Sequence, residues 1–97
     1  MAQKRFAFDF EDRSPKSIAF ECDGSERLQT STEGGVPFVF ANRAGMLALA
    51  KLLVKLSMGL SMGEYKQGFH VHLRPDFSDD AAQSDVLTIL LDESVDE

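Results

Sequence analysis

Two histidines stand two residues apart in GFHVHLRPDF, residues 68–77, and they are the residues of this chain best suited to chemistry. His70 and His72 could share a metal ion, because imidazole is a common ligand, or they could form an acid/base pair. A zinc site needs four protein ligands, or three and a water. Neither Cys22 nor the nearby carboxylates supply a fixed third ligand. The two histidines are therefore weak candidates for a metal site, and we expect no resident metal or cofactor.

An acid/base role needs a nucleophile, and the sequence offers none near the histidines. Ser57 and Ser61 fall on or after the expected helix, and Cys22 has no base directed at it. The chain holds one HxH motif where two-histidine phosphoesterases need two, and the junction FANRAG is no phosphate loop. We expect a non-enzymatic protein. The alternative is a metal-binding protein or metal-dependent enzyme centred on the two histidines.

The alternation of residues 68–74 predicts the direction of these side chains. Successive side chains of a β-strand point to opposite faces. The apolar residues at 69, 71 and 73 should therefore face the core, while His70, His72 and Arg74 should lie on the outer face. A face that mixes these groups with apolar residues is typical of a protein interface. Binding of a partner, self-association as a homodimer, and a merely exposed sheet face all remain open.

An α+β fold should position this strand. Alternating hydrophobic residues predict strands over 5–11, 17–23, 27–33, 36–41, 68–74 and 85–93. Asn42 is an N-cap residue that predicts a helix over RAGMLALAKLLVKLSMGL, residues 43–60. The order β-β-β-β-α-β-β predicts a mainly antiparallel sheet of five to six strands with one long helix packed on one face. The chain, residues 1–97, should form a single domain with a frayed acidic end at 94–97.

The same patterns predict which faces are buried. The helix should present to the core Leu49, Leu53, Leu56 and Leu60, and should turn to solvent a narrow stripe of Ala44, Ala48, Lys51 and Lys55. The strand VPFVFA should be more buried than residues 27–33, and the apolar run DVLTILLDE should be buried on both faces.

The net charge of −6 is concentrated at one end of the chain. Residues 1–75 hold ten Lys/Arg and eight Asp/Glu, a net of +2, whereas residues 76–97 hold eight Asp/Glu and no base, a net of −8. This distribution argues against nucleic-acid binding. It favours either a solvated tail or the steering of a basic protein partner by Asp76, Asp79 and Asp80.

Two further features bear on the compartment. The longest apolar region, residues 44–60, is interrupted by Lys51 and Lys55 and is too short to span a bilayer. The single cysteine, Cys22, cannot form an internal disulfide. We therefore expect a cytoplasmic protein that neither enters a membrane nor carries a signal peptide.

The run FANRAGMLALAKLLVKLS, then GFHVHLRPD, then an acidic spacer and DVLTILLDE resembles the small immunity proteins of bacterial polymorphic toxin systems. The resemblance covers residues 38–93 and implies a non-enzymatic protein that binds and blocks a cognate toxin, here a basic toxin domain. The positions that match the family pattern are Asn42, Gly45, Leu47, Leu49, Ala50, Leu53, Leu56, His70, His72 and Leu73. The residues expected to bind the partner are His70, His72, Arg74, Asp76, Asp79 and Asp80.

Overall fold

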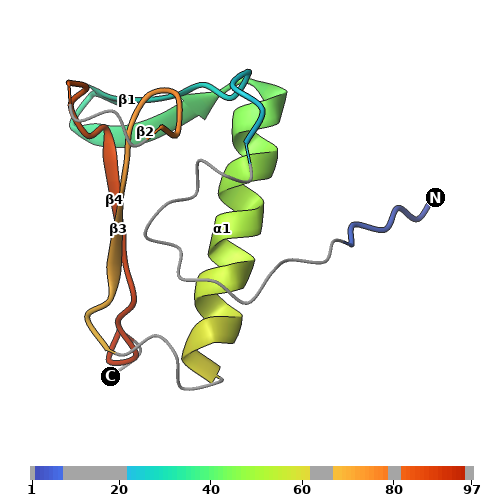
Figure 1. Cartoon of the computed structure of the whole chain (residues 1–97). Helices are drawn as coiled ribbons and strands as arrows, with labels where there is room; N and C mark the ends of the chain where they lie inside the picture. Colours follow the sequence, from blue (N-terminus) through green and yellow to red (C-terminus); the bar gives the residue numbers. More distant parts are fainter. Residues whose placement is uncertain (1, 8–21, 62–66, 79–81, 96–97) are drawn as a thin grey trace.

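The computed structural model describes residues 2–7, 22–61, 67–78 and 82–95. Its elements are β1 (Leu28–Glu33), β2 (Val36–Ala41), α1 (Arg43–Ser61), β3 (His70–Leu73) and β4 (Leu87–Leu90). Strands β1 and β2 form one antiparallel hairpin, and β3 and β4 form another. In Figure 1 the β3–β4 hairpin and α1 both run down the picture, and the β1–β2 hairpin crosses at the top. The α+β class and the single helix are confirmed.

The expected sheet of five to six strands is wrong for the part of the chain that the structure describes. Four strands form two separate two-stranded sheets, in the order β-β-α-β-β, so the helix is not packed on one large sheet. Of the two N-terminal strands expected, residues 5–7 and 22–23 are not extended strand, and residues 8–11 and 17–21 lie outside the described residues. Residues 5–7 and 22–23 pair with no strand among the described residues, and an alternating segment needs a partner to form a strand.

The β1–β2 hairpin is closed by a two-glycine turn. Gly34 and Gly35 have φ values of 59° and 80°, as a type I′ turn requires at both central positions. The register pairs Glu33 with Val36, and the pairs then alternate between hydrogen-bonded and non-hydrogen-bonded. Pro37, opposite Thr32, falls at a non-hydrogen-bonded pair, where its missing N–H leaves the ladder intact.

Strand β2 is exposed along nearly its whole length, contrary to the expectation that it is the more buried strand of its hairpin. Val36, Phe38 and Phe40 share one face and are exposed, and Val39 on the opposite face is exposed as well. The rings of Phe38 and Phe40 lie 5.7 Å apart between centroids. The hairpin contributes to the core mainly through Leu28, at the start of β1.

Asn42 caps α1 and also ties the preceding loop to it. Its Oδ1 accepts hydrogen bonds from the backbone N–H of Gly45, at 2.7 Å, and of Arg27, at 3.0 Å. Its Nδ2 donates to the carbonyl of Ser25 at 2.8 Å. The N-cap expected from the sequence is confirmed, and the same side chain joins the helix to residues 25–27.

We expect Asn42→Ala to lower the free energy of unfolding by about 2 kcal/mol, more than the roughly 1 kcal/mol of an ordinary N-cap, because three hydrogen bonds are lost. Asn42→Asp keeps both accepted bonds and loses the one donated to Ser25, so it should have about half the effect. Urea denaturation followed by circular dichroism measures both. A loss of only about 1 kcal/mol for the alanine variant would mean that the cap does not brace the loop.

Helix α1 packs against the core over a face that matches the expected one only in part. Leu56 is buried and Leu49 packs against the core, as expected. Lys55, assigned to a solvated stripe, is only 1% exposed, and Ala48 is buried beside it. Leu53, assigned to the core, is 47% exposed. The inner face packs with β3 in a core of Leu28, Ala48, Leu52, Leu56, Val71, Leu73 and Phe77. The helix is apolar on nearly all sides, so its periodicity identified the buried side only in part.

Strand β4 alternates in burial and is not buried on both faces. Leu87 and Ile89 pack against the core cluster, whereas Thr88 and Leu90 are exposed.

The two hairpins are joined by a backbone hydrogen bond, in which the N–H of Leu28 in β1 donates to the carbonyl of Pro75, after β3, at 2.8 Å.

No helix among the described residues has the length and apolar content needed to cross a membrane.

Candidate functional site

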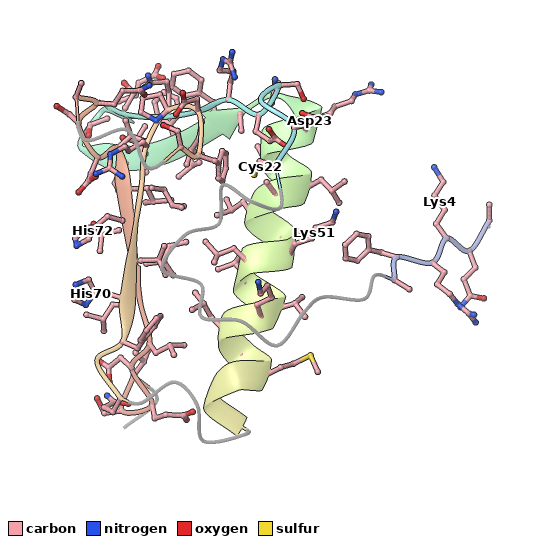
Figure 2. All side chains as sticks on the ribbon, in the orientation of Figure 1. Lys4, Cys22, Asp23, Lys51, His70 and His72 are labelled. Atoms are coloured by element: carbon pink, nitrogen blue, oxygen red, sulfur yellow. The ribbon has the colours of Figure 1, made fainter. Side chains whose placement is uncertain are left out.

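The outer face of the β3–β4 hairpin holds both histidines. His70 and His72 are exposed, and Figure 2 shows them pointing away from α1. Val71 and Leu73, between and beyond them, are buried in the core. The direction predicted from the period-2 alternation is confirmed for these four residues.

The register places an apolar residue and a hydroxyl beside the imidazoles. His70 pairs with Leu90, and His72 pairs with Thr88. The two rings meet edge to face, with centroids 4.9 Å apart. Leu90 is 55% exposed, so an apolar side chain stands on this face without cover from the described residues. We call His70, His72, Thr88 and Leu90 the hairpin face.

A carboxylate lies at one end of the hairpin face. The Nδ1 atom of His72 is 2.9 Å from the Thr88 hydroxyl and 3.2 Å from Oδ2 of Asp85. Asp92 and Glu93 follow β4 at the other end and are exposed. The hairpin face therefore combines imidazole and leucine in its middle with carboxylates at both ends.

Arg74 lies at the end of β3 and holds the following loop. Its Nε donates to the carbonyl of Gln83 at 3.2 Å, and its guanidinium also donates to the carbonyl of Ser78 at 3.4 Å. Asp85 is 3.9 Å from the same Nε, a distance typical of a partly solvated ion pair. Arg74 is thus tied to the loop, and Asp85 links it to His72.

Asp76 is fixed within this loop. Its Oδ1 accepts from the backbone N–H of Ser78 and its Oδ2 accepts from Nε2 of Gln83, each at 3.0 Å. Hydrogen bonds from the Ser78 side chain, from Gln83 and from the Ser78 backbone lower the pKa of Asp76 from 3.8 to about 2. Asp79 and Asp80, the other two carboxylates expected to steer a partner, lie outside the described residues.

The lowered pKa of Asp76 predicts a pH dependence of stability. A carboxyl group whose pKa is lower in the folded state stabilises the fold above pH 3.8, and this contribution is lost as the pH falls through about 2. We expect the stability difference between the native protein and Asp76→Asn to be full at pH 6 and to shrink towards pH 2. Gln83→Ala should raise the pKa of Asp76 in a carboxyl-carbon NMR titration. A midpoint near 3.8 in the native chain would contradict the hydrogen-bonding described.

The described residues contain no group of three His, Cys, Asp or Glu side chains arranged to hold a metal ion. His70 and His72 lie together, but Nδ1 of His70 is 3.2 Å from the carbonyl of Gly68, and Nδ1 of His72 faces Thr88 and Asp85. Cys22 is on a different part of the fold, beside the N-terminal half of α1 (Figure 2). The third ligand that a zinc site needs is therefore not supplied by Cys22.

A pocket of about 320 Å³ lies beside the N-terminal half of α1. Cys22, Glu26 and Lys51 are among its lining residues, together with apolar side chains of the helix. The carboxylate of Glu26 accepts hydrogen bonds from the backbone N–H groups of Asp23 and Gly24, at 3.1 and 3.0 Å. This carboxylate therefore braces the loop from its C-terminal end, and Asp23 forms an Asx turn within it, because its Oδ1 accepts from the backbone N–H of Ser25 at 2.9 Å.

Two features of the structure around the hairpin face were not expected from the sequence. Phe77 is buried at a left-handed backbone conformation, φ 62°, which no turn signal in RPDF announced. The strand VPFVFA, whose residue types predict the more buried strand of its hairpin, exposes Val36, Phe38 and Phe40. A usable signal was present in the partner strand, LQTSTE, whose polar residues indicate a hairpin with little cover on one face.

No protein-family model, no curated protein and no solved structure matches this chain.

Proposed function

We propose that this protein is a small immunity protein that binds and neutralises a cognate bacterial toxin, and that the hairpin face is its docking surface. The observation that carries the proposal is the composition of this face. An exposed leucine and two imidazoles stand between carboxylates at both ends, a pattern of apolar centre and charged rim that protein interfaces favour.

Charge supports a basic partner. Residues 76–97 carry eight acidic residues and no base, and Asp85, Asp92 and Glu93 stand at the ends of the hairpin face. A one-signed rim accelerates encounter with an oppositely charged protein and adds less to the final affinity. On this proposal Asp76, Asp79 and Asp80 add to the negative charge that steers the partner, while His70, His72 and Leu90 make the contacts that determine the dissociation rate.

The proposal requires a toxin gene beside the gene for this chain. We expect a bacterial host that expresses the toxic domain of the adjacent reading frame to grow only when this chain is co-expressed. Leu90→Arg should abolish protection, because it places a cation and a bulky side chain at the centre of the face. A Kd measured by calorimetry with an inactive toxin should rise at least about 100-fold.

Val36→Arg is the matched control, since it makes the same kind of change on the other hairpin at an even more exposed position. It should leave protection intact. Loss of protection by both variants, or by neither, would place toxin binding elsewhere. The absence of an adjacent toxin gene would remove the immunity function itself.

A further inference from the structure

Between Met46 and Met58, helix α1 turns large apolar side chains to solvent. Met46, Leu47, Leu53, Val54 and Met58 are each 38–48% exposed, and Lys55 is buried on the other side of the helix. Surface helices usually turn polar and charged side chains to solvent. The five side chains form an apolar patch of roughly 400 Å², comparable with the largest patch on a typical monomer.

Four residues run along one edge of this patch at alternating spacings of four and three. They are Met46, Ala50, Leu53 and Ser57, here called the seam. This spacing keeps side chains in one line along a helix and is the spacing of helix-pairing surfaces. Along the seam, large and small residues alternate.

The alternation makes the seam complementary to itself. When a second α1 is laid antiparallel about a twofold axis midway between Ala50 and Leu53, Met46 faces Ser57 and Leu53 faces Ala50. Every large side chain then meets a small one, which is how facing helices interdigitate. The antiparallel arrangement also sets the helix dipoles head to tail.

We propose that the seam is a homodimer interface, in which α1 pairs antiparallel with α1 of a second copy of this chain. The interface is distinct from the hairpin face and does not depend on the proposed toxin. Two such patches bury roughly 800 Å² in total, below the ~1,200 Å² at which standard stable interfaces begin. The dimer is therefore weak, with a Kd in the micromolar to sub-millimolar range.

Sedimentation equilibrium of the full chain between about 1 and 500 μM tests the proposal. The expected result is a monomer at the low end and a rising dimer fraction towards the high end. Leu53→Glu should raise the Kd at least about 100-fold, because each dimer would bury two unpaired carboxylates. Val36→Glu, an exposed apolar residue outside the seam, should leave the Kd unchanged. A native chain that stays monomeric at 500 μM overturns the proposal.

A charge-pair experiment tests the register. Ala50→Lys and Leu53→Glu should each prevent dimerisation alone, with helix content unchanged by circular dichroism. Mixed in equal amounts, with one variant labelled with nitrogen-15, they should form a heterodimer in native mass spectrometry, because the antiparallel register sets position 50 opposite position 53. If the mixture forms no heterodimer at concentrations where the native chain dimerises, this register is excluded. If the native chain is monomeric and Leu53→Glu still abolishes protection against the toxin, the seam is a toxin-binding surface and not a dimer interface.

Discussion

Gly45→Ala should lower the free energy of unfolding by about 3 kcal/mol, the upper range for forcing an extra atom into a close-packed site. A Cβ at this position would overlap the carbonyl oxygen of Arg27 and would come within 3.1 Å of the Cβ of Ala41. The Arg27 carbonyl cannot move away freely, because it accepts a hydrogen bond from the N–H of Asn42. The N–H of Arg27 in turn donates to Oδ1 of Asn42. Urea denaturation at pH 7 measures the effect.

The direction of the change in stability distinguishes Gly45 from a glycine in an ordinary helix. In an ordinary helix interior alanine is more favourable than glycine by about 1 kcal/mol. Ala50→Gly, in the interior of the same helix, is the control and should lose roughly that amount through propensity alone. If Gly45→Ala were neutral or stabilising, the loop at residues 25–27 could not be packed on the helix as described, and Asn42 would be an ordinary N-cap.

Features with local causes were predictable from the sequence. The cap at Asn42 and the direction of His70 and His72 depend on a few neighbouring residues and on the fixed period of a strand, and both are confirmed. Gly45 was noted only as part of a family resemblance. Its physical role depends on Arg27, which is 18 residues earlier in the chain, so no local pattern could reveal it.

Features that depend on distant contacts were not predictable. The helix could be oriented only in part from its sequence: Leu49 and Leu56 face the core as expected, but leucine, methionine and alanine occur on all sides, and the charge of Lys55 predicts exposure for a residue that is buried. The predicted number of strands was wrong for a related reason. Alternation predicts that a segment can be a strand, but pairing decides whether it is one, and β2 and β4 pair only within their own hairpins among the described residues. The sequence predicted the excess of acidic residues near the C-terminal end, but not the positions of Asp85, Asp92 and Glu93 at the two ends of the hairpin face.

Phe77 illustrates a residue whose backbone and side chain have opposing requirements. It is 1% exposed and belongs to the core, yet its φ of 62° is a conformation that costs a non-glycine residue roughly 1–2 kcal/mol. Its N–H donates to the carbonyl of Arg74 at 3.0 Å, which closes the turn after β3. Burial of the ring thus holds the loop that carries Asp76 in a strained turn.

We expect Phe77→Ala to lower the free energy of unfolding by about 3–4 kcal/mol, through loss of the buried ring. Phe77→Gly removes the same ring and also relieves the left-handed backbone, so it should be at least as stable as the alanine variant. Leu56, a buried residue of α1, gives the control: there the glycine variant should be less stable than the alanine variant by about 1 kcal/mol. Urea denaturation of the four variants measures both differences.

The comparison separates the two roles of Phe77, because ring loss is common to both of its variants and only the backbone differs. A glycine variant less stable than the alanine variant by about 1 kcal/mol would mean that residue 77 is not left-handed in solution. The turn after β3 would then have a different shape, and Asp76 would lose its bonds to Ser78 and Gln83. Its pKa would return towards 3.8 in the same sample, so the stability measurement and the NMR titration of Asp76 must agree.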